Sequence, residues 1–252
     1  MVQHDLLGKV ERFMLERVIP AEQEHHQQLQ SAANRWTYTP VLRDLRAQAR
    51  AAGLWNFVMP PELGGLGLSL LDYAPICEVM NWCNHGPEVF NAYTGTISNA
   101  TTLARHANDD LKQRYLLSLL AGETRSCISI TERNVPSSDP TELKFAIRRD
   151  GDAYVLNGVK SWATGGAMAE CAFVLVLGET DGSAPRHARH SMVLVPRDAP
   201  GLSTGRIETV MGYDDAPFGH CDLIFDNVRV PVSNRIGAEG EGFLMMQSTL
   251  GV

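Results

Sequence analysis

The chain has 252 residues, of which 44% are hydrophobic, so it exceeds the usual size of one domain and can build two cores. A formal net charge of -7 argues against nucleic acid and anionic membranes as general partners, and leaves small molecules or other protein chains. The sequence contains no run of ~18 apolar residues and no basic start followed by an apolar segment, which predicts a soluble, unprocessed protein without a membrane span.

Residues 1–124 are predicted to form an N-terminal helical domain, because apolar residues recur there every three or four positions. One such face contains Leu6, Leu7, Val10, Phe13, Met14 and Val18, and another contains Val41, Leu42, Leu45, Ala49 and Ala52. Residues 60–67, rich in proline and glycine, predict a loop, and a further helix is expected through residues 73–80. Asn108 is positioned to cap the last helix, which Gly122 ends.

Residues 125–232 are predicted to form a middle β domain, because the apolar period there changes to two. Asp150-Gly151 is a hairpin signal, and residues 171–177, 191–195 and 221–225 are further strand candidates. Short strands with polar turns favour an antiparallel barrel or sandwich over a parallel sheet, which makes the expected fold class α+β. Since no Gly-x-Gly-x-x-Gly follows a strand, a dinucleotide would not be held in the Rossmann manner.

The C-terminal residues 233–252 are interpreted as a linker and the first turns of a C-terminal helical bundle. Residues 242–250 predict a helix that has just begun, and the chain then stops at Gly251-Val252. We therefore expect a truncated chain, whose apolar helix face would need a partner to cover it.

Two short segments point to chemistry. Ser129-Ile130-Thr131-Glu132 is followed ~30 residues later by Lys160-Ser161-Trp162-Ala163-Thr164-Gly165-Gly166, and an aromatic face with a hydroxyl and glycines at strand ends suits a flat, redox-active ring. A lone tryptophan in a β-rich stretch is more often part of the core. The pairing of the two segments therefore predicts a flavin site.

The five cysteines are scattered without a Cys-x-x-Cys pair, so they predict neither a zinc site nor a disulfide framework. We expect buried thiols in a reducing compartment, the cytoplasm, with the mitochondrion or the peroxisome as the alternative in a eukaryote. The histidines show no ligand spacing, so no metal is expected, and His25, His26, His187 and His190 are interpreted as solvated surface residues.

Several motifs in the same order resemble the acyl-CoA dehydrogenase family of flavoproteins. They are Thr131-Glu132, Trp162-Ala163-Thr164-Gly165, the segment 225–231 (Phe-Asp-Asn-Val-Arg-Val-Pro) and the segment 237–243 (Gly-Ala-Glu-Gly-Glu-Gly-Phe). The segments 53–57, 87–91, 125–127 and 212–217 are similar to the subgroup that contains family members ten and eleven. The similarity spans essentially the whole chain.

The resemblance implies an FAD site. It places the strand segment with Ile128, Ile130 and Thr131 at the pyrimidine edge of the flavin, and Trp162 and Ala163 against the ring. The Thr164 hydroxyl would donate to flavin N5, the atom that accepts hydride.

Ser138 would lie near the cofactor pyrophosphate or the phosphates of an acyl-CoA substrate. Without the resemblance, Ser138 would be read as an ordinary turn hydroxyl. The family's catalytic base is a glutamate of the C-terminal bundle, so no catalytic residue is expected in this chain, and Glu132 is interpreted as a structural hydrogen-bond acceptor.

The chain also departs from the family. Arg133, Asn134 and Pro136 stand where the family usually has Pro, then Asp or Gly, and Ala after Thr-Glu. The charge of Arg133 either serves an anionic substrate or marks a relaxed constraint on this loop. Thr96 and Thr101 stand where the subgroup has an acidic pair, in a region that lines the acyl side of the cavity in relatives, so the usual substrate is in question.

Three functions are compatible with these features. The first is an FAD-dependent dehydrogenase of acyl-CoA or another acyl thioester, incomplete without its C-terminal domain or a partner chain, which passes electrons to an electron-transferring flavoprotein. The second is a non-catalytic partner subunit in a homo- or hetero-oligomer of dehydrogenase-like chains. The third is a flavin-dependent biosynthetic oxidase that acts on a carrier-bound acyl group.

Overall fold

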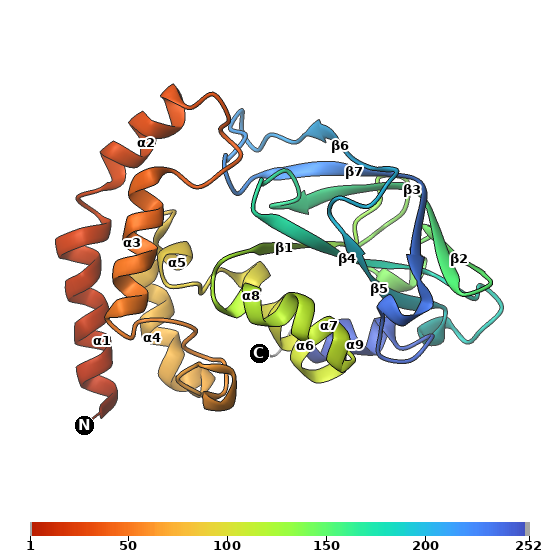
Figure 1. Cartoon of the computed structure of the whole chain (residues 1–252), viewed down its shortest axis with the longest axis horizontal. Coiled ribbons are helices and arrows are strands. Elements are labelled where there is room, and N and C mark those ends of the chain that lie inside the picture. Colours follow the sequence, from red (N-terminus) through yellow and green to blue (C-terminus); the bar gives the residue numbers. More distant parts are fainter. Residues whose placement is uncertain (1, 250–252) are drawn as a thin grey trace. The chain divides into compact units, whose positions relative to one another are not determined.

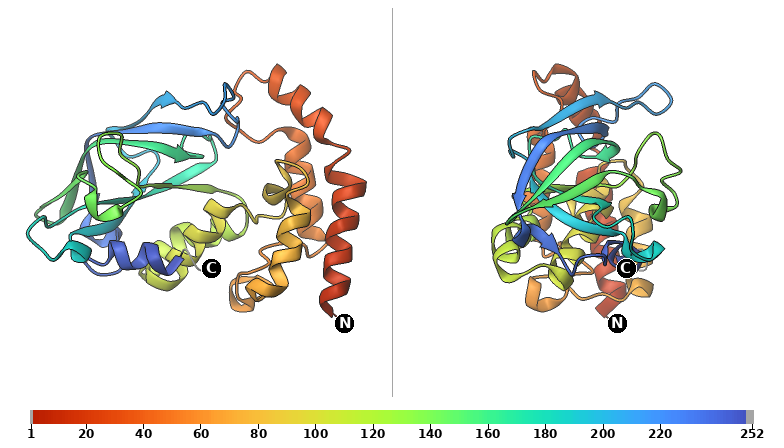
Figure 2. Two further views of the ribbon diagram at one scale, coloured as in Figure 1. Left: turned by 180° about the vertical axis from the view of Figure 1, so that it is seen from behind. Right: turned by 90° about the vertical axis from the view of Figure 1, so that its right-hand side faces the viewer.

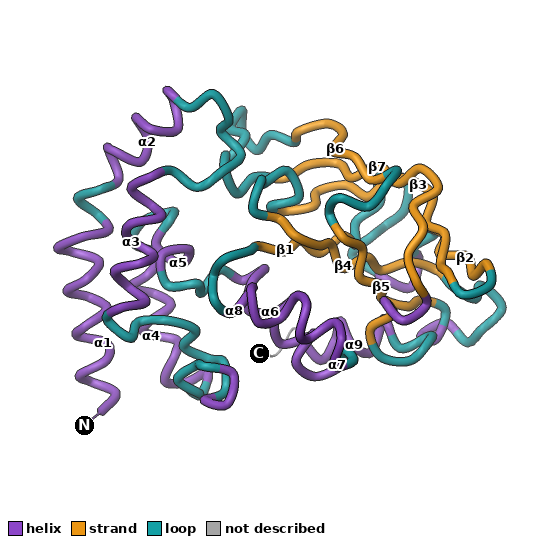
Figure 3. The backbone as a smooth tube through the Cα atoms, in the orientation of Figure 1, coloured by secondary structure: helices purple, strands orange, loops and turns teal. Residues whose placement is uncertain are grey.

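The computed structural model describes residues 2–249 and divides the chain into two compact units, the first ending at Ile97 and the second beginning at Ser98. The domain boundaries predicted at 124/125 and 232/233 follow the change from helices to strands and back, whereas this division follows compactness. The predicted boundaries therefore stay a prediction. Figure 1 shows all the elements in chain order, and Figure 3 shows that every strand belongs to the second unit.

The first unit is helical. It contains α1 (Val2–Phe13), which continues into a π-helical turn (Met14–Val18), then α2 (Glu22–Ser31), α3 (Pro40–Ala51), a 3-10 turn (Pro61–Leu63), α4 (Leu70–Met80) and α5 (Gly86–Val89). The predicted apolar faces of α1 and α3 lie in its core, where Val10, Met14 and Leu42 are fully buried. Residues 60–67 form the predicted loop around the 3-10 turn.

The helices of the second unit come before and after its strands. α6 (Thr94–His106) leads into α7 (Asp109–Leu111), a π-helical turn (Lys112–Leu116) and α8 (Leu117–Leu120), and α9 (Gly242–Thr249) follows the sheet. The predicted cap is confirmed, because the Leu111 amide donates to Asn108 Oδ1 at 3.0 Å. Gly122 ends the helix with a φ of 71°, as predicted.

The described residues form an eight-stranded sheet. Its strands are β1 (Arg125–Ser129), β2 (Ala146–Asp150), β3 (Ala153–Thr164), β4 (Cys171–Glu179), β5 (His190–Pro196), β6 (Leu202–Ile207), β7 (His220–Pro231) and β8 (Arg235–Ile236). They run in the order β6-β7-β3-β2-β4-β5-β8, and β1 pairs β4 outside that order. The predicted hairpin at Asp150-Gly151 joins β2 to β3.

Helices followed by a β region are confirmed, but closure into a barrel is wrong. The sheet is open, because β6 and β8 occupy its two ends, and it is mixed rather than antiparallel. β1 pairs β4 in parallel, since the chain makes the β2–β3 hairpin between them, and β2 also meets β4 in parallel at Ala146 and Glu179.

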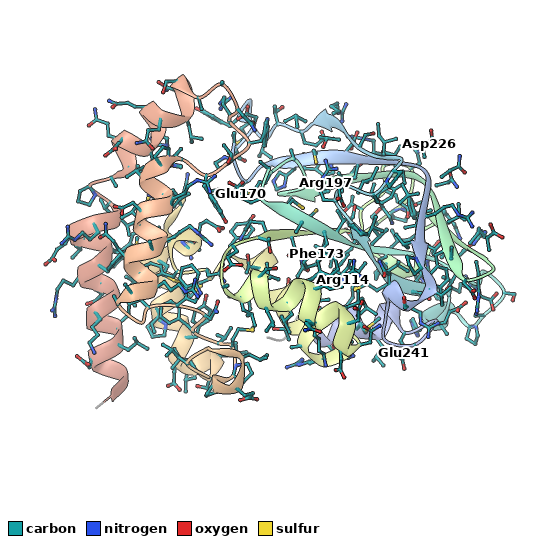
Figure 4. The ribbon with its side chains drawn as sticks, in the orientation of Figure 1. Arg114, Glu170, Phe173, Arg197, Asp226 and Glu241 are labelled. Atoms are coloured by element: carbon teal, nitrogen blue, oxygen red, sulfur yellow. The ribbon has the colours of Figure 1, made fainter. Side chains whose placement is uncertain are left out.

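The core of the second unit is centred on β4 and β5, which are buried along almost their whole length. The helices α6 to α9 lie on one side of the sheet in both views of Figure 2. Phe173 of β4, labelled in Figure 4, meets the edge of the Tyr115 ring at 5.2 Å, which ties the helix before β1 to the sheet.

Three expectations about single residues are wrong. His25 and His190 are buried rather than solvated: His25 Nδ1 lies 2.8 Å from Thr39 Oγ1, and His190 Nε2 lies 2.9 Å from the Leu143 carbonyl. In each buried ring one nitrogen has a polar partner from another part of the sequence, whereas His190 Nδ1 is buried without a hydrogen-bond partner among the described residues. Cys77 is only half-buried, whereas the other four thiols are buried as expected.

The C-terminal segment forms a helix as predicted, with Met245 buried and Leu244 64% exposed. Residues 250–252, which include the expected stop at Gly251-Val252, lie outside the described residues. Within residues 2–249, no helix combines the length and apolar character needed to cross a bilayer.

Candidate functional site

The two segments singled out by the sequence meet in the second unit. The Ser161 amide at the end of β3 donates to the Thr131 carbonyl at 2.8 Å, and Lys160 Nζ donates to the Ile130 carbonyl at 2.7 Å. These bonds join the segment that follows β1 to the last residues of β3. Their acceptors are the carbonyls of Ile130 and Thr131, which the resemblance places at the edge of the flavin ring. Ile130 and Thr131 are half-buried, as is Ile128 within β1.

A β-bulge projects Trp162 out of the sheet. The pairing of β3 with β7 shifts register between Lys160 and Ala163, and Trp162 has a φ of +56°. Its side chain is 41% exposed, while Ser161 and Ala163 on either side are buried. A bulky residue in the left-handed region costs about 1–3 kcal/mol, so the fold holds this indole outward at a cost in stability.

One member of a buried ion pair lies next to the bulge in the sequence, two residues before Trp162. Lys160 is fully buried, and its Nζ lies 2.8 Å from Glu132 Oε1. Burial lowers the pKa of Lys160 to about 8, although the Glu132 carboxylate opposes that shift.

The Glu132 carboxylate is fully committed to structure. Burial by itself would raise its pKa, but the Lys160 ammonium and the amides of Lys144 and Phe145, at 2.9 and 3.0 Å, lower it. A carboxylate with a lowered pKa and three donors is a poor proton acceptor, in keeping with the structural role expected for it.

Thr164 and Trp162 share a neighbour that the sequence did not reveal. Thr164 lies opposite His220 in the β3–β7 ladder, and Thr164 Oγ1 is 2.8 Å from His220 Nδ1. The His220 ring also lies 5.6 Å from the Trp162 ring, centroid to centroid, at an interplanar angle of 55°. One imidazole therefore contacts both side chains predicted to face a flavin.

The altered loop after Glu132 is anchored by charge. Arg133 Nη2 lies 2.8 Å from Asp222 Oδ1 and also pairs with Glu208, both of which are buried. Glu208 pairs as well with Arg206, at 3.0 Å. The charge that replaces the family's usual proline thus has internal partners on and beside β7.

The turn after Thr164 is fixed by backbone bonds. Gly165 has a φ of +73°, and its amide donates to the Gly219 carbonyl at 2.9 Å. Arg197, labelled in Figure 4, donates from Nε to the Gly166 carbonyl at 3.0 Å. These bonds hold the backbone next to Thr164 in place, and with it the Thr164 hydroxyl.

Ser138 differs from these residues because no hydrogen bond within the described residues anchors its side chain. It is exposed in a turn, whereas its neighbour Ser137 is the hydroxyl that closes the loop, accepting from the Glu132 amide and donating to the Glu132 carbonyl, both at 2.8 Å. Thr96 and Thr101, the positions of the expected acidic pair, are both buried in α6.

Sequence reasoning missed His220, the carboxylates that bind Arg133, and the ion pair that Lys160 of the quoted motif makes with Glu132. The β3–β7 register sets His220 opposite Thr164, and the other pairs join residues 28 to 89 positions apart in the sequence. The described residues contain no group of three or more His, Cys, Asp or Glu side chains arranged to hold a metal ion.

Chemically, the arrangement offers a partly exposed aromatic face, a hydroxyl braced beside it and a backbone segment tied along its edge. Such a set fits a planar heteroaromatic ring with polar atoms at its rim, because stacking holds the ring and single donors orient it.

Comparison with known proteins shows which family the chain resembles. The family model of the acyl-CoA dehydrogenase N-terminal domain matches residues 2–123, and that of the middle domain matches residues 127–228. The chain is 40% identical over 252 residues to mouse acyl-CoA dehydrogenase family member 11, covering 98% of this chain and 32% of that protein. It therefore spans about a third of the length of that relative.

Solved structures show the same similarity. A Mycobacterium abscessus protein assigned to the acyl-CoA dehydrogenases superposes with a TM-score of 0.94 at 39% identity, over 100% of this chain and 64% of that one. A glutaryl-CoA dehydrogenase from Mycobacterium smegmatis in complex with FADH2 superposes with a TM-score of 0.76 at 24% identity, over 99% and 58%, which is a likeness of fold.

Proposed function

Because the chain belongs to the acyl-CoA dehydrogenase family, we propose that it forms part of an FAD-dependent enzyme that dehydrogenates an acyl-CoA thioester between its α and β carbons. Family membership supports a dehydrogenase-like oxidoreductase. The substrate, the cofactor and the residue roles below belong to the proposal.

The observation that carries the proposal is the bulge at the end of β3. Trp162 is held in a left-handed conformation with 41% of its side chain exposed, and the backbone beside it is tied to Thr131. A fold gains nothing in stability from an outward, strained tryptophan, so its presence favours a binding role.

In this proposal, FAD supplies the hydride acceptor of the reaction. Trp162 and Ala163 pack against its ring, the Thr164 hydroxyl lies at the reactive nitrogen, and the amide groups of Ile130 and Thr131, next to Ile128, bind the pyrimidine edge. Their carbonyls are held by Lys160 and Ser161, which fixes the direction of the segment.

The chain's own residues would orient the substrate and the ring rather than remove the α-proton. Glu132 is engaged by Lys160 and by two amides, so we propose that the base comes from outside the described residues. Ser138, exposed at its turn, is proposed to face the phosphates of the cofactor or of the acyl-CoA. A multimer of dehydrogenase-like chains and an electron-transferring flavoprotein as acceptor belong to the same proposal.

The first experiment is a titration of the purified chain with FAD, followed by flavin fluorescence, with light scattering to report the assembly that binds. The test variant is Trp162→Gly, because glycine suits the positive φ and should preserve folding. The control is Trp82→Gly, which removes a tryptophan of similar exposure in the first unit.

We expect Trp162→Gly to weaken FAD binding about 5- to 30-fold, which corresponds to a lost stacking contact of about 1–2 kcal/mol, and Trp82→Gly to leave it unchanged. Equal affinity in all three proteins would refute the ring site. In an assembly that supplies the proposed outside base, acyl-CoA-dependent bleaching of bound FAD would separate the dehydrogenase from a non-catalytic subunit, and rapid reoxidation by oxygen would identify an oxidase.

A further inference from the structure

His220 contacts both Thr164 and Trp162. We propose that it is a positioning residue whose Nδ1 protonation decides whether the Thr164 hydroxyl can donate a hydrogen bond to a bound flavin ring. The inference rests on the proposed function, and it assigns to His220 a role that neither the sequence motifs nor the family resemblance gave it.

The geometry fixes the imidazole against the hydroxyl. Thr164 and His220 are direct partners in the β3–β7 ladder, and the next residue along, Gly165, donates from its amide to the Gly219 carbonyl at 2.9 Å. With the backbones joined there, the contact of 2.8 Å between Thr164 Oγ1 and His220 Nδ1 is short enough for one well-formed hydrogen bond.

The hydroxyl has a single proton, so its role depends on the partner. When Nδ1 carries no proton, the Thr164 hydroxyl donates to it and can offer other groups only its lone pairs. When Nδ1 is protonated, it donates to Oγ1, and the hydroxyl proton is free to point at a ring nitrogen. With the neutral ring in its Nε2–H tautomer, protonation of His220 therefore switches Thr164 from donating to Nδ1 to accepting from it.

Trp162 is part of the same arrangement. Its indole lies 5.6 Å from the His220 ring, centroid to centroid, so a change of charge on the imidazole alters the surroundings of the indole.

The charged groups around His220 come from β7 and from the segment after β6. Asp222 follows two residues later on β7, and the Glu208 amide donates to the His220 carbonyl at 2.9 Å. Both carboxylates are paired, Asp222 with Arg133 and Glu208 with Arg133 and Arg206. β3 contributes Thr164 and Trp162, neither of which titrates near neutral pH.

The test has one arm without cofactor. The chain has four tryptophans, so Trp162 emission of the ligand-free protein is taken as the difference in emission between the wild type and Trp162→Gly, and it is followed from pH 5 to 9, the range in which histidines usually change charge. We expect a pH-dependent loss of emission at low pH that disappears in His220→Phe, which keeps a planar ring, and persists in His187→Phe, a surface control. An identical profile in wild type and His220→Phe would overturn the contact itself.

The second arm uses FAD labelled with nitrogen-15 at N5 and bound to the chain, with the N5 resonance recorded over the same pH range. In the wild type the resonance should shift to its hydrogen-bonded position as pH falls. In His220→Phe it should become independent of pH, and in Thr164→Val it should stay at the unbonded position throughout.

The two proposals fail in different ways. Absence of FAD binding by the wild type would refute the flavin site and, with it, this role of His220. Tight FAD binding with an N5 resonance that does not respond to pH, or that responds equally in His220→Phe, would refute the role of His220 alone.

Discussion

The buried pair of Lys160 and Glu132 allows a quantitative test. Lys160 is fully buried, and burial lowers its pKa from 10.5 to about 8 even with Glu132 Oε1 at 2.8 Å. That shift corresponds to about 3 kcal/mol spent on keeping the ammonium charged inside the protein. We therefore expect Glu132→Gln, which removes the counter-charge, to lower the free energy of unfolding by about 3–5 kcal/mol at pH 7.

The pH dependence has a definite sign. The folded pKa of Lys160 lies below its unfolded value of 10.5, so the unfolded state binds more protons between about pH 8 and 10.5, and stability from this group rises with pH across that window. In Glu132→Gln the ammonium loses its partner, so part of the loss should be recovered as pH rises and Lys160 gives up its proton.

The assay is urea unfolding of four chains, namely wild type, Glu132→Gln, Lys160→Met and the double variant. The double variant should be more stable than the sum of the two single losses predicts, by about 1–3 kcal/mol, because it leaves no unpaired charge in the core. Asp150→Asn breaks the exposed pair with Arg229 and serves as control, with an expected change below about 1 kcal/mol. Additive single losses, or a loss in Glu132→Gln no larger than in the control, would contradict the reasoning.

Three other features give predictions. Burial, with help from neighbouring histidines, lowers the pKa of His25 to about 4, so stability should fall by up to about 3 kcal/mol as pH drops from 6.5 to 4, and His25→Phe should flatten thermal unfolding over that range. Arg133→Ala leaves Asp222 without its guanidinium partner, and urea unfolding should show a loss of about 1–3 kcal/mol that Arg133→Lys restores in part; full stability in Arg133→Ala would mean that the loop is not anchored by charge. Gly201 has a φ of +87°, and an added Cβ would collide with the Asp226 carbonyl, so Gly201→Ala should cost more than about 1 kcal/mol in calorimetry, while a neutral result would contradict the described turn.

Local signals in the sequence predicted the local parts of the fold. A side-chain cap and a left-handed C-terminal residue depend only on neighbouring residues, so the start of the helical segment at Asn108 and its end at Gly122 could be predicted. The hairpin at Asp150-Gly151 could be predicted for the same reason. The form of the sheet was harder to predict from the sequence. Its mixed, open form depends on β1 reaching β4 past a whole hairpin, and β6 is a half-exposed edge strand without a clear apolar alternation.

The candidate site divides along the same line. Trp162 and Thr131 could be proposed from the sequence because each belongs to a short motif, and Glu132 accepts hydrogen bonds as expected. His220 was missed because its importance comes from the ladder that sets it opposite Thr164. His25 was misjudged for a related reason, since its burial depends on the hydroxyl of Thr39.

The parallel pairing of β1 with β4 also sets an order of events during synthesis. β1 ends at Ser129, whereas β4 begins only at Cys171, so a growing chain exposes the first strand well before its partner exists. Over that interval β1 is an unpaired edge, open to mispairing with other nascent chains. Pairing of β1, the strand that leads into Thr131, therefore waits until the chain has been made as far as β4, a late, long-range encounter.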